Sequence, residues 1–268
     1  MPRALWRSIL LACLLLGPAP LALAQGAWQS QDIGNTVPGS TDITNGVFTI
    51  RGNGADIYGS QDAFRFVYVL ADGDCEIQAR VVAQEPLNDW SKAGVMIRQN
   101  PDAGSPHIHI NRNPNPSHGI EWQVRPTPNG ATNTQSAADV NTLPVWLRAR
   151  REGNTFTTYF APDVSGRPGA WTLHGPSTQV SMTNPVHVGL SVLSHVQGTL
   201  GSATFDNVVT SGTRRAGAGI VVSRAATARP APSPAARVLA SFLRPAWRSA
   251  AAIAPPLSPM ATRPRPGA

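Results

Sequence analysis

The chain has 268 residues, of which 41% are hydrophobic and 14% are charged, and its formal net charge is +7. This composition is too apolar and too poor in charge for a typical disordered chain, and the 24 glycines and 25 prolines argue against a helical bundle. Only two cysteines are present, which excludes a scaffold held by several disulfides.

The positive charge is concentrated at the two ends of the chain. Residues 211–268 contain nine arginines and no acidic residue, and residues 1–24 contain two arginines and no acidic residue. All 15 acidic residues therefore lie in 25–210 beside eleven basic ones, which gives this segment a net charge of −4. A mildly acidic central segment predicts no nucleic-acid partner for the folded domain, whatever the total charge.

Residues 1–24 have the three-part pattern of a secretory signal peptide. Arg3 and Arg7 form a basic region, Ile9–Leu16 is an apolar run, and Ala22-Leu23-Ala24 is a small-residue cleavage site. The apolar run is too short to span a bilayer comfortably. We therefore expect an exported protein, periplasmic or extracellular, with no transmembrane segment after cleavage.

The two cysteines have different expected fates. Cys13 is an alternative site for a lipid anchor, but apolar sequence continues after it, which is not typical of such an anchor. Cys75 is then the only cysteine of the mature chain. We expect it to lie buried and unreactive in a strand.

Residues 25–210 are predicted to be all-β, because short runs of alternating or β-branched residues are separated by Gly, Asn, Asp or Pro. Asn45-Gly46 is a plausible tight-turn pair. So many strands over this length favour a jelly-roll sandwich of two antiparallel sheets. The expected strands are Gly46–Arg51, Phe64–Leu70, Cys75–Ala83, Gly94–Gln99, His107–Arg112, Gly119–Arg125, Val145–Arg151, Thr155–Phe160, Val186–His195 and Ser202–Thr210.

Residues 211–268 have a different composition, dominated by Ala, Pro and Arg. Proline recurs too often for a helix or sheet to persist, so a disordered tail is expected. Two alternatives stay open. The segment could be the product of a frameshift in G+C-rich DNA that truncated a longer protein, or a tail that binds membranes or nucleic acid through its arginines.

Three stretches in chain order resemble a known bacterial family. Trp90 to Arg98 resembles the signature W-x-K-A-G-V-M-I-R of a concanavalin A-like module of unknown function, often labelled as related to regulation of enolase. The other two stretches are Gly54–Gly59 with Asp62–Phe64, and Val188–His195 with Gly198–Leu200 and Ala203–Val208. The resemblance spans roughly 27–210. It implies a concanavalin A-like jelly roll, exported and often attached to or beside carbohydrate-active enzymes, and no established catalytic residues.

Catalytic carboxylates are weakly indicated. Glycoside hydrolysis needs two carboxyl groups about 5–10 Å apart, and the glucanases of this superfamily place them in an E-x-D-x-x-E motif that this chain lacks. Asp72, Asp74 and Glu76 alternate, but Asp72-Gly73-Asp74 is typical of a solvated turn. Glu121 lies on an expected strand without a carboxylate partner nearby in sequence. We therefore assign no catalytic residue.

Metal sites have two candidates. His107 and His109 have the spacing that puts two imidazoles on one face of a strand, but the glutamate that follows such a pair in cupin sites is missing, so an exposed polar face is the simpler interpretation. Asp32 near the first strand and Asp206 near the last could share a structural Ca²⁺ ion, although surface acids at strand ends are the simpler interpretation here too. No other cofactor is expected.

Sugar binding combines an aromatic platform with a few polar groups that contact hydroxyls. Trp90 and Trp171 lie beside expected loops and are the better candidates for exposure, whereas Trp122 and Trp146 lie within expected strands. The polar candidates, if their strands form one concave sheet, are Lys92, Arg98, His107, His109, Gln123 and Arg125.

We therefore expect a secreted, non-catalytic module that binds a polysaccharide or glycan, or mediates adhesion, and that is accessory to polysaccharide-active enzymes. A glycoside hydrolase or lyase is the first alternative, and a structural accessory domain truncated from a larger exported enzyme is the second. The sequence predicts neither the glycan nor the oligomeric state. Fold alone does not decide between these functions, because the same sandwich hosts all of them.

Overall fold

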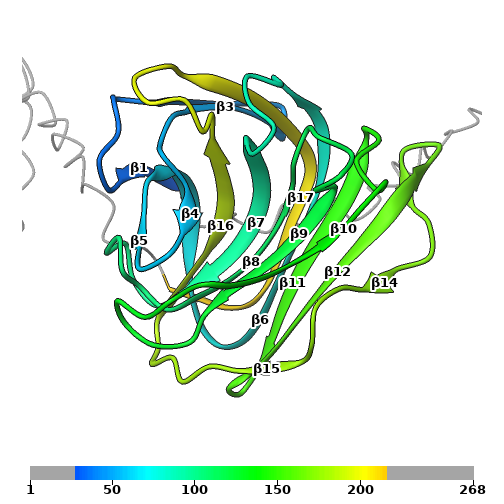
Figure 1. Ribbon diagram of the computed structural model, residues 1–268. Coiled ribbons are helices and arrows are strands. Elements are labelled where there is room, and N and C mark those ends of the chain that lie inside the picture. Colours follow the sequence, from blue (N-terminus) through cyan, green and yellow to red (C-terminus); the bar gives the residue numbers. More distant parts are fainter. Residues whose placement is uncertain (1–27, 216–268) are drawn as a thin grey trace, which may run out of the picture. The chain divides into compact units, whose positions relative to one another are not determined.

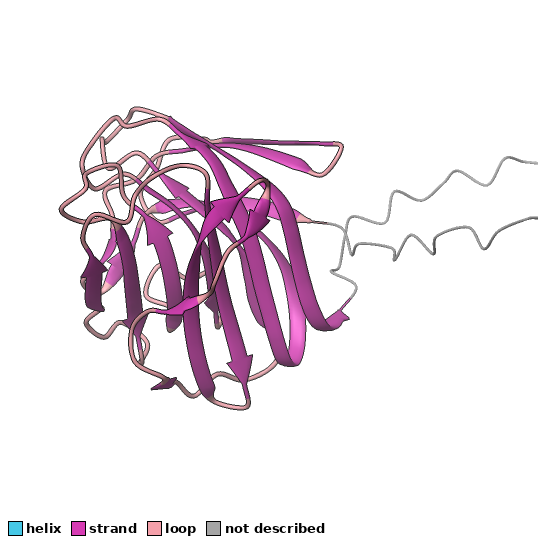
Figure 2. Cartoon of the chain, turned by 90° about the vertical axis from the view of Figure 1, so that its right-hand side faces the viewer, coloured by secondary structure: helices cyan, strands magenta, loops and turns pink. Residues whose placement is uncertain are grey.

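The computed structural model describes residues 28–215, and side chains up to residue 212, so residues 1–24 and most of 211–268 lie outside it. Every regular element in this part of the chain is a strand (Figure 2). The strands are β1 Gln29–Ile33, β2 Ser40–Thr44, β3 Val47–Gly52, β4 Ile57–Tyr58, β5 Gln61–Asp62, β6 Phe64–Gln84, β7 Lys92–Arg98, β8 His107–Arg112, β9 Ile120–Arg125, β10 Asn133–Ala137, β11 Val145–Glu152, β12 Thr155–Val164, β13 Arg167–Pro168, β14 Thr172–Leu173, β15 Thr178–Gln179, β16 Val186–Leu193 and β17 Gly201–Arg215. Within this range no helix is long and apolar enough to cross a membrane.

The strands form two antiparallel layers that share one long strand (Figure 1). The first layer has the order β10-β9-β8-β7-β16-β6, and the second layer contains β6, β11 and β12 with β17 and β3. The first half of β6 pairs with β16, and its second half pairs with β11. This architecture confirms the all-β jelly-roll sandwich.

β6 corrects one detail of the prediction. Two strands and a solvated turn were expected over this stretch, but a single strand runs from Phe64 to Gln84. Gly73, with φ of 70°, lies where the pairing passes from β16 to β11, so Asp72-Gly73-Asp74 is a bend within the strand and not a hairpin end. A glycine suits this position because it adopts positive φ without a steric penalty.

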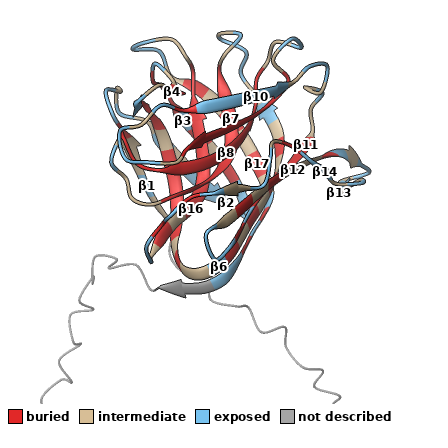
Figure 3. Cartoon of the chain, turned by 60° about the horizontal axis from the view of Figure 1, so that its bottom comes forward, coloured by how far each residue is buried: buried red, intermediate tan, exposed pale blue. Residues whose placement is uncertain are grey.

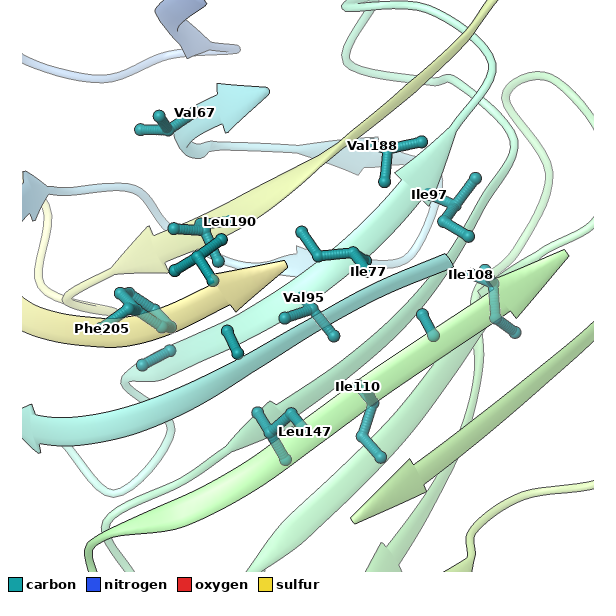
Figure 4. Close-up of a cluster of buried hydrophobic side chains, with 14 of the residues drawn as sticks. Val67, Ile77, Val95, Ile97, Ile108, Ile110, Leu147, Val188, Leu190 and Phe205 are labelled. Carbon is teal, nitrogen blue, oxygen red and sulfur yellow. The ribbon is translucent and has the colours of Figure 1, made fainter. Parts of the chain in front are cut away.

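The hydrophobic core lies between the two layers. Val95, Ile108 and Leu190 of the first layer belong to one buried cluster with Ile77 and Leu147 of the second layer (Figure 4). The cause is period-two alternation, which sends every other side chain of each strand into the core. Burying each such side chain contributes about 1.5–3 kcal/mol. Trp122 belongs to the same cluster, as the sequence predicted.

The Asn45-Gly46 turn is confirmed, since it joins β2 to β3 with φ of 52° and 79°. Two of the strands that the sequence missed, β2 and β10, are mostly polar and lie at sheet edges. β10 is the end strand of the first layer and is mostly exposed (Figure 3). Such strands carry no apolar alternation, so their sequences do not identify them.

Candidate functional site

The outer face of the first layer is buried, and it carries both polar side chains and a second apolar cluster that includes Ile57, Phe66 and Met96. In β7, β8 and β9 every residue is buried, on both faces of the strands (Figure 3). One face packs into the core, and the other carries polar side chains that align across the strands in register. One row contains His187, Arg98, His107 and Arg125, and the next contains Gly189, Met96, His109 and Gln123.

The short hairpin of β4 and β5 closes this face, and Asp62 of β5 is its main anchor. Arg125 contacts the Asp62 carboxylate at 2.7 Å and Arg98 contacts it at 3.2 Å. Burial lowers the pKa of Arg98 to about 10, although the charge of Asp62 opposes that shift. His107 Nδ1 lies 3.6 Å from Asp62. Burial and the two neighbouring guanidinium groups hold the pKa of His107 well below its usual value, so its imidazole is neutral.

The same hairpin also covers the row that contains His109 and Gln123. His109 contacts Gln123 Oε1 at 2.8 Å and the Ser191 hydroxyl at 2.7 Å. Gln123 Nε2 donates to the Ile57 carbonyl oxygen of β4 at 2.7 Å. Burial lowers the pKa of His109 to about 3. The neutral imidazole therefore serves as a hydrogen-bonding link between β8, β9 and β16.

This geometry changes the interpretation of five predicted sugar-binding residues. Their exposed fraction is 0%, so a ligand does not reach them in this conformation; they are Arg98, His107, His109, Gln123 and Arg125. His107 and His109 do share one face of a strand, but that face is covered and not exposed as expected. The sequence named these residues as candidates for one shared face, and it gave no sign of the hairpin that covers that face.

An open pocket remains at the edge of this face. Its volume is about 320 Å³, and we call it the Lys92 pocket. The lining residues come from the β4–β5 hairpin, the start of β7, β9, β10 and the loop after β16; they are Asp56, Tyr58, Trp90, Lys92, Glu121, Thr134 and His195. Two predicted residues, Trp90 and Lys92, therefore line a cavity together.

Lys92 joins two carboxylates in this pocket. Its Nζ lies 3.1 Å from Asp56 Oδ1 and 3.3 Å from Glu121 Oε2, and its side chain is only 1% exposed. By the sum of these distances, the two carboxylate oxygens are at most about 6.4 Å apart, so both carboxylates lie at one pocket. Glu121 is thus buried beside a carboxylate partner that its sequence neighbours do not reveal.

The surroundings of Asp56 favour its ionised form. Burial raises the pKa of Asp56, but a hydrogen bond with His195 and the charge of Lys92 outweigh it, and the net direction is down. His195 Nε2 lies 3.5 Å from Asp56 Oδ2. An acid of lowered pKa is a poor proton donor near neutral pH and a good acceptor of hydrogen bonds from hydroxyl groups.

The aromatic wall of the pocket is held by local hydrogen bonds. Trp90 N donates to Asn88 Oδ1 at 2.9 Å, and the Ser91 hydroxyl donates to the Ser194 carbonyl oxygen at 2.7 Å. The second bond ties the start of β7 to the loop that carries His195. His118 stacks on Trp90 with ring centroids 3.5 Å apart, and Tyr58 is 56% exposed at the opening. The pocket therefore offers flat aromatic surface beside polar groups.

The remaining predicted residues lie elsewhere. Trp171 packs on Arg148, which belongs to β11 of the second layer. Asp32 pairs with Arg65 at the start of β6, whereas Asp206 pairs with Arg80 near its end. The structure does not bring Asp32 and Asp206 into one site, because each contacts a different arginine. Among the described residues, no group of three or more His, Cys, Asp or Glu side chains is arranged to hold a metal ion.

Sequence reasoning did not assign Asp56, Tyr58, Thr134 and His195 to a site. A signal was nevertheless present, because each of the three stretches that carry the family resemblance contributes to the pocket. The first contributes Asp56 and Tyr58, the second Trp90 and Lys92, and the third His195.

Comparisons with known proteins address the fold. A functionally unknown protein from Saccharomyces cerevisiae aligns with a TM-score of 0.53 at 18% identity, over 70% of this chain and 96% of that one. The carbohydrate-binding module CBM66 from Bacillus subtilis aligns with a TM-score of 0.41 at 16% identity, over 69% and 95% of the two chains. Lectin I-B4 from Griffonia simplicifolia aligns with a TM-score of 0.42 at 10% identity, over 71% and 96%.

Only the yeast protein aligns closely enough to show a common fold, and none of the three assigns a ligand to this chain. No protein-family model and no curated protein matches the sequence. The resemblance to the enolase-related family therefore stays a prediction.

Proposed function

We propose that this protein is a non-catalytic module that binds a glycan in the Lys92 pocket. The observation that carries the proposal is the arrangement of Lys92 between Asp56 and Glu121, with Trp90 and Tyr58 beside them. Charged and aromatic groups arranged in this way suit a sugar, because carboxylates accept hydrogen bonds from hydroxyls and an indole ring contacts the apolar face of a pyranose.

The cellular role follows from the sequence. The signal-peptide pattern of residues 1–24 supports export to the periplasm or beyond. We propose that the exported module is accessory to polysaccharide-active enzymes and holds these enzymes at their substrate. Adhesion through the same bound glycan is the alternative role.

Hydrolysis is the second candidate, because Asp56 and Glu121 are two carboxylates in one pocket. A glycosidase needs one of its two carboxyl groups protonated at working pH. The pKa of Asp56 is lowered, which makes this carboxyl group a poor proton donor, and Lys92 contacts both carboxylates; this arrangement supports binding over cleavage.

A screen of glycans and polysaccharides with the full chain tests the proposal. Retention and sugar release are measured in the same wells, with and without calcium. We expect retention on a glycan without released sugar, lost in Trp90→Ala. Released oligosaccharide that disappears in Glu121→Gln would overturn the non-catalytic assignment. Retention that requires calcium would indicate a bound metal ion at a site that the sequence did not suggest, because Asp32 and Asp206 pair with different arginines.

A further inference from the structure

The outer face of the second layer carries an arginine held between two aromatic rings. The guanidinium carbon of Arg148 lies 4.5 Å from the ring centroid of Tyr159 and 4.2 Å from that of Trp171. Tyr159 faces Arg148 across β11 and β12, and Trp171 directly precedes β14, which pairs with β12. We call these three residues the Arg148 clamp. It lies on β11 and β12, whereas the Lys92 pocket is lined from the hairpin, β7, β9 and β10.

Arg148 differs from its neighbours because it has no acidic partner in the described part of the chain. Arg80, which is paired with Trp146 two residues before Arg148, contacts Asp163 at 2.7 Å and Asp206 at 2.9 Å. Arg150, two residues later on the same face, pairs with Glu152. The buried Nε of Arg148 has no hydrogen-bond acceptor. A positive group left in this state attracts an anion, since its hydrogen-bonding capacity is unused.

The surroundings of the clamp show what kind of anion fits. Register places one residue from each of five strands in a single row; they are Val209, Gln78, Arg148, Tyr159 and Leu173. The two ends of this row are exposed apolar side chains, with Val209 55% and Leu173 52% exposed. The centre therefore offers a charged fork, an amide and aromatic rings, and the ends offer apolar contact.

We propose that the Arg148 clamp is a second binding site that takes the carboxylate of a uronic acid in an acidic polysaccharide. The guanidinium fork matches a carboxylate with two parallel hydrogen bonds. The aromatic rings fix its plane and offer apolar surface to the pyranose ring that bears the carboxylate. A single unpaired guanidinium matches the single charge of a uronate. The site is independent of the Lys92 pocket.

Polygalacturonate and alginate are suitable probes, with dextran as the neutral polymer. We expect the full chain to bind both uronate polymers and not dextran at this site. Arg148→Gln should weaken uronate binding by at least about tenfold, which corresponds to about 1.4 kcal/mol. Arg150→Gln is the matched control, because it removes the same charge from the same face and its partner Glu152 is exposed. It should change binding less than twofold.

Three results would overturn the proposal. The first is equal weakening by Arg148→Gln and Arg150→Gln, which would indicate general electrostatic attraction. The second is equal binding of polyglutamate with the same dependence on Arg148, which would indicate an acidic peptide as the ligand. The third is wild-type affinity in Arg148→Lys, which keeps the charge and loses the planar fork.

Circular dichroism shows whether each variant is folded. Trp171→Phe keeps an aromatic ring beside Arg148 and serves as a milder variant if Arg148→Gln does not fold; we expect it to weaken uronate binding, and unchanged affinity would contradict the clamp. Trp90→Ala separates this site from the proposed function, because it should leave uronate binding intact whether or not the Lys92 pocket binds a glycan.

Discussion

Both terminal nitrogens of Arg125 donate hydrogen bonds to the carboxylate of Asp62, from Nη1 to Oδ2 at 2.8 Å and from Nη2 to Oδ1 at 2.7 Å. Both side chains are fully buried. The pair joins β9 to the β4–β5 hairpin and holds the hairpin over the polar face of the first layer. That face is thereby closed to ligands, and the Lys92 pocket at its edge stays open.

We expect Asp62→Ala to lower the free energy of unfolding by about 3–5 kcal/mol, because Arg98 and Arg125 would then be buried without a counter-charge. Urea unfolding measures this loss. Asp42→Ala in the exposed strand β2 is the matched control and should change stability by less than about 0.5 kcal/mol. Equal effects of the two substitutions would contradict the anchoring role of Asp62.

Stability should fall as the pH drops below about 6.5, because burial lowers the pKa of His107 and of His109, the latter to about 3. Below about pH 6.5 these histidines bind protons in the unfolded chain and not in the folded chain. The stability that is present above this pH is therefore lost progressively as the pH falls towards the folded-state pKa. Each such histidine contributes a slope of about 1.4 kcal/mol per pH unit. The groups that face these histidines are Arg98, Arg125, Lys92 and Asp62.

His109→Gln tests this dependence. The amide keeps hydrogen-bonding capacity and does not titrate, so the variant should lose one histidine's share of the slope. Urea unfolding at about pH 7 and about pH 5.5 measures the slope in a range where free carboxyl groups are mostly ionised. A variant with the same slope as the wild type would show that His109 is protonated equally in both states.

Lys92 and Glu121 should be energetically coupled. Lys92→Met leaves Glu121 buried without its positive partner, and Glu121→Gln leaves Lys92 with Asp56 alone. We expect the double variant to be more stable than the sum of the single effects predicts, by at least about 1 kcal/mol. Additive effects would indicate that the contact between Lys92 and Glu121 contributes nothing to stability.

Cys75 should not react with thiol reagents in the native protein. The side chain is buried, and burial raises the pKa of its thiol to about 11, so the reactive thiolate is scarce. We expect a disulfide reagent such as dithionitrobenzoate to modify Cys75 only in denaturant. Rapid modification of the native chain would contradict the burial of this residue.

The sequence identified the strands of the core because their alternation is set by burial. The range predicted for β8 is the one observed, and Ile108 and Ile110 of this strand belong to the buried core. β2 and β10 were missed because edge strands have no buried face to impose alternation. The bend at Gly73 was taken for a turn because a glycine between two aspartates is typical of both.

The site was predicted only in part, for a different reason. Alternation indicated that His107 and His109 share a face of one strand, but it gave no information on what covers that face. The hairpin that closes it, β4 and β5, has two residues in each strand, and its Ile57 carbonyl and Asp62 carboxylate meet partners far along the chain. Contacts of this kind depend on tertiary structure and leave no local pattern.

The most direct test of the account is the affinity of the full chain for the glycan that the screen identifies, measured by titration calorimetry for wild type, Trp90→Ala and Trp171→Ala. We predict that Trp90→Ala weakens binding of a neutral glycan by at least about tenfold, or about 1.4 kcal/mol, because it removes the aromatic wall of the Lys92 pocket. Trp171→Ala removes the same residue type from the second layer and should leave this affinity unchanged. Wild-type affinity in Trp90→Ala, or an equal loss in both variants, would contradict binding in the Lys92 pocket.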